Sequence, residues 1–129
     1  MSVTVDWDNE DKTAIRYDFE GRWDWNDFRA ATTKGFALTR SVTQRVDTIS
    51  NFYPGAKLPS DALFQFNRAM KGAPANRGVT VIVGGTAFIK NLVGIFTRVH
   101  KPLGQRLLLA SSLEEARAKL TAQAKRRDM

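Results

Sequence analysis

Gly78-Val79-Thr80-Val81-Ile82-Val83-Gly84-Gly85 opens the last third of the chain and decides its fold class. The run from Val79 to Val83 is apolar and β-branched apart from Thr80, which is typical of a strand buried on both faces. A helical pattern follows from Thr86 to about His100, then the apolar triplet Leu107-Leu108-Leu109, then another helical pattern from Leu113. Strands that alternate with helices in this way predict an α/β fold in which helices cover parallel strands.

The first two thirds of the chain add strands and helices to this unit. The segments 3–7 and 14–19 alternate apolar and polar residues, which predicts a β-hairpin. A helix is expected over 25–40 with Asp24 as its N-cap, a strand over 45–52, and a helix over 61–70 with Ser60 as its N-cap. We therefore expect one domain over residues 1–122, with a basic tail over 123–129. Its mixed five-stranded sheet is flanked by four helices in the order β-β-α-β-α-β-α-β-α, and the pattern leaves the strand order open.

Composition restricts the chemistry that the chain can carry out. The 129 residues include no cysteine, which excludes disulfides and thiolate metal sites. No apolar run approaches the length of a membrane span, and the first residues lack the pattern of a signal peptide, so we expect a cytoplasmic protein without a membrane span. The net charge is +7, yet residues 1–27 carry eight acidic and only three basic side chains. This asymmetry fits a basic face for an anionic partner, or an acidic hairpin that lies against a basic neighbour.

Four stretches resemble STAS-type domains, a family of small modules that includes bacterial anti-sigma factor antagonists and has a CRAL-TRIO-like architecture. Val46–Ser50 resembles the family's apolar-Asp-x-Ser strand end, and Ser60 falls where the family has its serine-bearing motif. Gly78–Gly84 resembles its central strand, and the stretch from Thr86 through Ala116 resembles its final helix, short strand and last helix. The resemblance covers about residues 10–122. It implies a STAS-like fold and a non-enzymatic regulatory module that binds a protein partner.

The expected partner surface is the loop and helix start over residues 53–63, with Tyr53, Lys57, Ser60 and Asp61 as the candidate contacts. Ser60 is also the candidate phosphorylation site, because phosphate at a helix start gains backbone N–H bonds and a favourable helix dipole. An N-cap role explains the same serine without phosphorylation. Phosphorylated family members carry Asp-Ser-Ser-Gly at this place, whereas this chain has Pro59-Ser60-Asp61-Ala62.

A second hypothesis is a carrier or sensor of a small apolar or anionic ligand. Its cavity would lie between the sheet and the second and third helices, lined by Phe64, Phe66, Phe88 and Leu92. Basic residues gather at the ends of the same two helices and predict a basic rim: Arg68, Lys71, Arg77, Arg98, Lys101 and Arg106. Such a rim suits an anion or an acidic partner, although cations also stabilise helix C-termini.

Other sites find little support in the sequence. We expect no cofactor and no metal, since His100 is the single histidine, and we see no catalytic constellation. The acidic spacing Asp6-x-Asp8-x-Glu10 fits a solvated hairpin turn better than a calcium loop. Trp25 is expected in the core and Trp23 closer to the surface. Basic residues without interleaved aromatics argue against nucleic-acid binding, and the sequence leaves homo-oligomer formation open.

Overall fold

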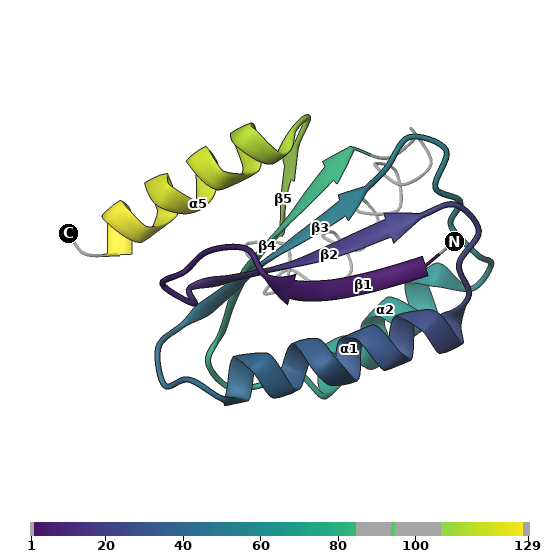
Figure 1. Ribbon diagram of the computed structural model, residues 1–129, viewed down its shortest axis with the longest axis horizontal. Coiled ribbons are helices and arrows are strands. Elements are labelled where there is room, and N and C mark those ends of the chain that lie inside the picture. Colours follow the sequence, from purple (N-terminus) through teal and green to yellow (C-terminus); the bar gives the residue numbers. More distant parts are fainter. Residues whose placement is uncertain (1, 85–93, 95–106, 128–129) are drawn as a thin grey trace.

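The computed structural model describes residues 2–84, 94 and 107–127 (Figure 1). These residues form a five-stranded mixed sheet and three helices. The strands are β1 (Ser2–Trp7), β2 (Ala14–Glu20), β3 (Val46–Phe52), β4 (Arg77–Gly84) and β5 (Leu107–Ala110). The helices are α1 (Trp25–Arg40), α2 (Ala62–Lys71) and α5 (Leu113–Arg127). The expected helix over 86–100 lies outside the described residues.

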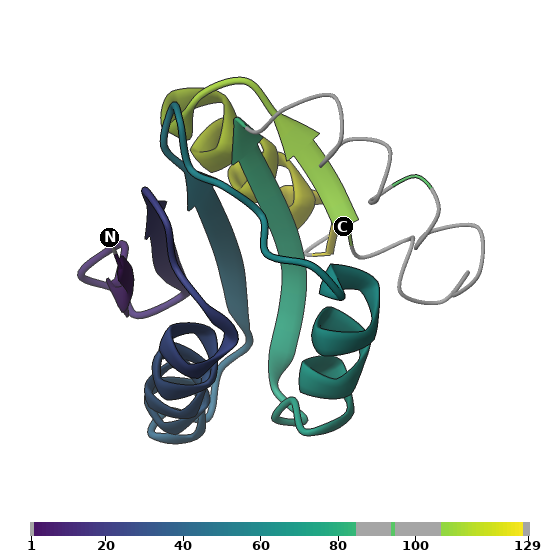
Figure 2. The same cartoon turned by 90° about the vertical axis from the view of Figure 1, so that its right-hand side faces the viewer.

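The strands lie in the sheet in their chain order, β1-β2-β3-β4-β5. The hairpin partner β1 is antiparallel to β2, and the pairs β2–β3, β3–β4 and β4–β5 are all parallel. Crossovers that step across the sheet in one direction with one hand place their helices on one face. Figures 1 and 2 show α1 and α2 below the sheet and α5 above it. The predicted α/β class and mixed five-stranded sheet are confirmed.

Local signals explain where the helices begin. Asp24 caps α1 as predicted: its carboxylate accepts from the backbone N–H of Asp27, and the carboxylate of Asp27 accepts from the N–H of Asp24. The start of α5 is capped by Ser112, whose hydroxyl accepts from the N–H of Glu115 at 3.1 Å. The carboxylate of Glu115 turns to Ser111 and accepts from that residue's backbone N–H at 2.9 Å. Helix α5 then continues to Arg127, through the first residues of the predicted basic tail.

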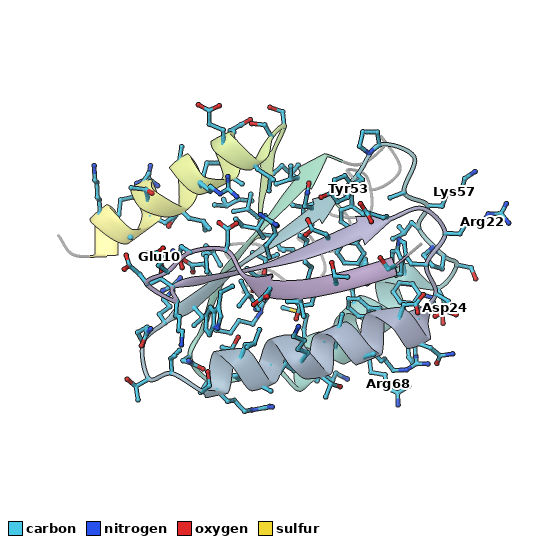
Figure 3. All side chains as sticks on the ribbon, viewed as in Figure 1. Glu10, Arg22, Asp24, Tyr53, Lys57 and Arg68 are labelled. Carbon is cyan, nitrogen blue, oxygen red and sulfur yellow. The ribbon has the colours of Figure 1, made fainter. Side chains whose placement is uncertain are left out.

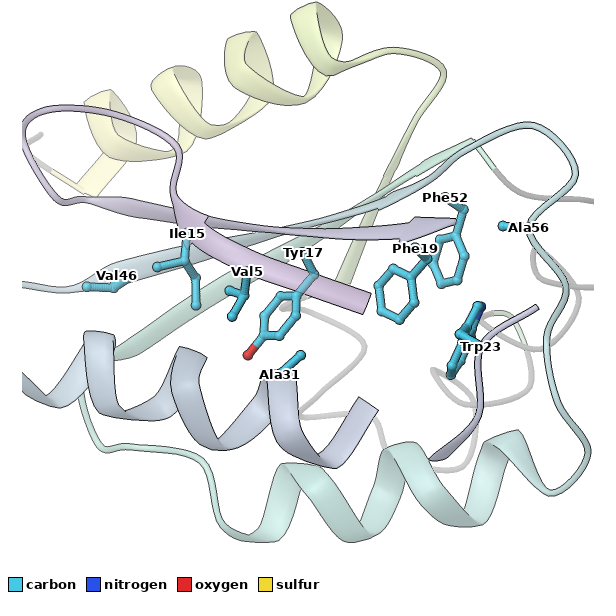
Figure 4. Packing of buried hydrophobic residues seen from close by; sticks show 9 residues of the cluster. All are labelled: Val5, Ile15, Tyr17, Phe19, Trp23, Ala31, Val46, Phe52 and Ala56. Atoms are coloured by element: carbon cyan, nitrogen blue, oxygen red, sulfur yellow. The ribbon is translucent and has the colours of Figure 1, made fainter. Parts of the chain in front are cut away.

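Side chains alternate between the two faces of the sheet and build two separate cores. On the α5 face, aliphatic residues pack together: Ala14, Ile49, Val79, Val81, Val83, Ala110, Ala116 and Leu120. On the α1–α2 face, the buried cluster is largely aromatic and contains Val5, Ile15, Tyr17, Phe19, Trp23, Ala31, Val46, Phe52 and Ala56 (Figure 4). Trp23 is only 4% exposed and Trp25 is half-buried, so the expected order of the two tryptophans was wrong.

Candidate functional site

A cavity of about 130 Å³ lies between the sheet and the helix pair α1–α2. Its floor consists of side chains from β2, β3, β4 and β5, and its other walls come from α1 and α2. The described residues that line it are Tyr17, Phe19, Phe28, Thr32, Phe36, Thr48, Ser50, Phe52, Phe66, Ala69, Met70, Arg77, Thr80, Ile82 and Leu107. The predicted apolar face of α1 therefore borders a cavity as well as a packed core, which leaves Phe28, Thr32 and Phe36 half-buried.

Aromatic rings form one end of this cavity, near the carboxyl ends of the strands. Phe19 stacks on Phe52 with ring centroids 4.3 Å apart, and both rings lie beside Trp23 in Figure 4. Phe28 meets Phe66 edge-on at 5.4 Å, which joins α1 to α2 across the cavity. Such aromatic pairs contribute about 0.5–1.5 kcal/mol each beyond their buried area. These contacts fix the walls at this end.

Hydroxyl groups and one guanidinium lie at the other end, beside Leu107, which pairs with Thr80 in the β4–β5 register. Thr48 pairs with Thr80 in the β3–β4 register, so both side chains lie side by side on the cavity floor. Arg77 lies at the start of β4 and donates a hydrogen bond from Nη2 to Oγ1 of Thr80 at 2.6 Å. Among the described lining residues, Arg77 is the only one with a charged side chain. The cavity is therefore largely apolar, with a few polar groups on its floor at this end.

Tyr17 extends from the middle of β2 into the same space. Burial raises the pKa of Tyr17 to about 12, although the positive charge of Arg77 and a hydrogen bond with Thr32 act in the opposite direction. The phenol is thus neutral at physiological pH. Its ring fits because residue 35 of α1 is glycine: a Cβ there would come within 2.0 Å of the phenolic oxygen. The absence of a side chain at Gly35 therefore leaves room for the ring of Tyr17 under the helix.

A second hollow lies on the outer side of the same helix pair. This groove of about 270 Å³ between α1 and α2 is lined by Phe28, Arg29, Thr32, Thr33, Phe36, Gln65, Arg68, Ala69 and Gly72. Four of these residues also line the cavity: Phe28, Thr32, Phe36 and Ala69. A layer one side chain thick therefore separates the cavity from the surface of the molecule along the α1–α2 seam.

The four predicted partner contacts lie together on the loop between β3 and α2. Tyr53, Lys57, Ser60 and Asp61 are all exposed, and Figure 3 shows Tyr53 and Lys57 at the edge of the molecule. Hydrogen bonds hold the backbone of this loop in place. The backbone N–H of Tyr53 donates to the carbonyl of Phe19, and the N–H of Lys57 donates to the carbonyl of Gly21. The indole N–H of Trp25 donates to the carbonyl of Ser60 at 2.8 Å.

Ser60 does not cap α2, so the N-cap prediction was wrong. The residue at the N-cap position is Asp61, which has φ of 70° and makes no side-chain hydrogen bond to the helix. The turn into α2 is formed by this left-handed residue, and a left-handed aspartate is uncommon but tolerated. The hydroxyl of Ser60 is therefore exposed without the capping role that would have explained it, and its phosphorylation stays a prediction.

The predicted basic rim is described only in part. Arg68 is exposed and borders the outer groove, and Lys71 is exposed at the end of α2. Arg77 is half-buried at the start of β4 and lines the cavity. Arg98, Lys101 and Arg106 lie outside the described residues.

The predicted ligand cavity has a different lining from the expected one. Phe66 lines it, whereas Phe64 is 57% exposed and lies off it; Phe88 and Leu92 lie outside the described residues. Its helical walls include α1, which was not expected. The sequence analysis missed the polar floor formed by Thr48, Ser50 and Thr80. The available signal was three hydroxyl side chains at inward positions of strands that are otherwise apolar.

The acidic turn between β1 and β2 forms ion pairs with other parts of the protein and is not simply solvated. The side chain of Asp8 is 4% exposed and accepts from Arg117 of α5 at 2.9 and 3.0 Å and from Arg16 at 3.2 Å. These contacts attach α5 to the β1–β2 turn and agree with the intramolecular explanation of the charge asymmetry. Within the described part of the chain, no group of three histidine, cysteine or acidic residues is placed to hold a metal ion.

No protein-family model and no curated protein matches the chain. Among residues 2–84, 94 and 107–127, no helix has the length and hydropathy that a membrane crossing requires.

Proposed function

We propose that the protein binds a small, largely apolar molecule in the cavity between the sheet and the helices α1 and α2, as a carrier or a sensor. The observation that supports this function is the cavity itself. Protein interiors are close-packed and hold few voids larger than a water molecule. The cavity is lined mainly by apolar side chains, and a ligand that covers them removes this apolar surface from water.

The dimensions and chemistry of the cavity define the ligand. An engineered cavity of about 150 Å³ in another protein stays dry and binds benzene, so this cavity suits a ring or short chain of similar size. Aromatic walls with a few polar groups at one end are typical of small-molecule sites. The thin α1–α2 seam supplies a short route to the surface, because rotation of Phe28 and Phe36 side chains would join the cavity to the outer groove.

Toluene, a neutral apolar probe, tests this function directly. We expect saturable binding to the full chain, reported by NMR shifts of the methyl groups of Thr48, Thr80 and Ile82. Ala69→Leu fills cavity volume from α2 and should weaken toluene binding more than tenfold. Ala118→Leu makes the same exchange at an exposed position of α5 and should leave binding unchanged. Absence of saturable shifts in the unmodified protein would overturn the proposal.

A protein-interaction surface over residues 53–61 is a second candidate function. The observation that favours it is the exposure of Tyr53, Lys57, Ser60 and Asp61 on a loop whose backbone is fixed by hydrogen bonds. A fixed surface loses little conformational entropy when a partner binds. In affinity capture from the native lysate, a partner of this loop should be lost with Tyr53→Ala/Lys57→Ala and retained with Lys34→Ala, an exposed site on α1. Equal capture by all three proteins contradicts this candidate.

We also infer a STAS-like architecture for the chain. The inference is supported by the order of the described elements and by the antiparallel first strand beside parallel ones. The fourth helix, which this architecture requires between β4 and β5, remains a prediction, as does a cytoplasmic location.

A further inference from the structure

The outer groove between α1 and α2 lies within a basic surface. Residues 28–40 carry three basic side chains and residues 62–72 carry two, and neither stretch contains an aspartate or a glutamate. The acidic residues of this part of the chain are found at the helix starts: Asp24, Asp27 and Asp61. Beyond the first turn, both helices therefore carry positive charges only.

Four of these basic side chains lie on or beside the groove: Arg29, Arg40, Arg68 and Lys71. All four are exposed, and none forms an ion pair with a carboxylate within the described part of the chain. Arg29 donates to the amide oxygen of Asn26, and Arg40 donates to the carbonyl of Gly72 at 3.1 Å. These neutral acceptors leave the positive charges uncompensated. Figure 3 shows Arg68 extending from the helix layer, away from the sheet.

The floor of the groove is apolar. Phe28, Phe36 and Ala69 line it and are half-buried. Phe64 continues this apolar surface on α2, because it is 57% exposed and lies one helical turn before Arg68, on the same side of the helix. Exposed apolar surface with a polar rim marks interaction sites. The complementary occupant therefore combines apolar side chains with negative charge.

The direction of the two helices defines the shape of this occupant. The starts of α1 and α2 lie together, since the indole of Trp25 bonds to the carbonyl of Ser60, and their ends meet where Arg40 bonds to Gly72. The groove thus runs along parallel helices. The eight residues from Phe28 to Phe36 span about 12 Å, whereas positions i and i+7 of another helix are about 11 Å apart. Apolar residues at this spacing are the anchors of helix-in-groove recognition.

We propose that the outer groove docks an acidic amphipathic helix of a protein partner, with its apolar side chains against Phe36 and Phe64 and its carboxylates at Arg29 and Arg68. Such a helix matches both the charge and the apolar floor, whereas the phosphate backbone of a nucleic acid matches the charge alone. This inference does not rest on ligand binding in the cavity, because the charged contacts come from exposed side chains on the outer side of the helix layer.

The probe is a synthetic peptide of about 18 residues, with leucines at helical spacing i, i+3, i+4 and i+7 and glutamates at the other positions. We expect saturable binding to the full chain at pH 7 in calorimetric titration, with NMR shifts at Thr33 and Gly72, which line the groove and not the cavity. Arg29→Glu/Arg68→Glu should weaken binding at least tenfold. Lys125→Glu/Arg126→Glu makes the same change of net charge at exposed positions of α5 and should change binding less than about twofold.

Two further peptides separate docking from general attraction between charges. The peptide with alanine in place of leucine should bind at least tenfold more weakly, and equal binding would overturn the proposal. The peptide with lysine in place of glutamate should bind Arg29→Glu/Arg68→Glu and not the unmodified protein. If the double variant does not fold, Arg68→Glu alone, at an exposed position, carries the same comparison.

The remaining outcomes also decide the matter. Absence of saturable binding by the glutamate–leucine peptide overturns the proposal, and toluene binding in the cavity then still tests the proposed function on its own. A single-stranded RNA that binds more tightly than this peptide, and loses its binding in Arg29→Glu/Arg68→Glu, would assign the groove to a nucleic acid and overturn the protein partner.

Discussion

On the α5 face of the sheet, valines and Ile49 pack against Ala116 and Leu120 of a single helix. On the opposite face, aromatic rings bridge the helices α1 and α2 and line a cavity of about 130 Å³. Small branched side chains fill the space under one helix evenly, whereas large flat rings that meet edge-on leave room between them. The comparison suits a protein in which the α5 face contributes mainly to stability and the α1–α2 face forms the proposed binding site.

The largest expected effect comes from replacing, one at a time, two isoleucines on the neighbouring strands β3 and β4 whose side chains point to opposite faces of the sheet. Ile49 is fully buried on the α5 face, and Ile82 lines the cavity. Ile49→Ala should lower the free energy of unfolding by about 4 kcal/mol, because it opens a new void in a packed core. Ile82→Ala should cost about 2 kcal/mol, since it only enlarges an existing space. Urea denaturation measures both, and equal losses would remove the distinction between the faces.

The next largest change in stability concerns the packing of Tyr17 beneath α1. Gly35→Ala would place a Cβ within 2.0 Å of the phenolic oxygen and 2.7 Å of the ring carbon that bears it. Alanine usually stabilises a helix interior relative to glycine by about 1 kcal/mol. Here we expect a net loss of about 2 kcal/mol from overpacking. Gly72→Ala is the control, because its nearest new contact is an ordinary 3.8 Å. A stabilised Gly35→Ala protein, measured in urea, would mean that Tyr17 moves freely into the cavity.

A smaller effect concerns the attachment of α5 to the hairpin. Arg117→Gln removes the paired bonds to the carboxylate of Asp8, whose side chain is 4% exposed. We expect a loss of about 1 kcal/mol, because Arg16 continues to pair with Asp8 and because Arg117 itself is half-exposed. Arg126→Gln changes an exposed residue of the same helix and should have no effect on thermal unfolding. Matching losses in the two variants would show that the Asp8 contact contributes nothing.

The sequence predicted most of the sheet because its signals are local or periodic. The β-branched run at Val79–Val83, the alternation in the hairpin and the Asp24 capping box each act within a few residues, and all three were confirmed. Ser60 failed as an N-cap because the chain turns into α2 through a left-handed residue, Asp61, and serine at a loop end carries no information on that dihedral angle.

The cavity could not be predicted in the same way. Its volume depends on how Phe19, Phe28, Phe52 and Phe66, from four different elements, meet across the core. No spacing in the sequence encodes the distance between α2 and the sheet. The inward hydroxyls of Thr48 and Thr80 were visible as exceptions in apolar strands, yet their pairing requires the β3–β4 register.

The α1–α2 face should respond to alkali through Tyr17. Its pKa is raised to about 12 from 10.0, so the folded protein holds the phenolic proton more tightly than the unfolded chain does. The resulting stability is complete below about pH 10 and is lost as the pH rises through 12. The absorbance of phenolate, measured as the unmodified protein minus Tyr17→Phe, should show a step near pH 12. A step near pH 10 would place the phenol in solvent.

The smallest effect concerns the α5 face, where stability is lost as the pH falls and not as it rises. Hydrogen bonds from the side chain and the backbone N–H of Ser111 lower the pKa of Glu115 to about 2 from 4.5. The stability that these bonds supply is complete above about pH 4.5 and is lost as the pH falls through 2. Carbon-13 NMR of the Glu115 carboxyl should therefore give a midpoint near 2, and Ser111→Ala should move it upward. A midpoint near 4.5 in the unmodified protein would show that this bond does not hold the start of α5. With the expected midpoint, acid weakens the first turn of the helix on one face, whereas alkali acts first on the wall of the cavity on the other.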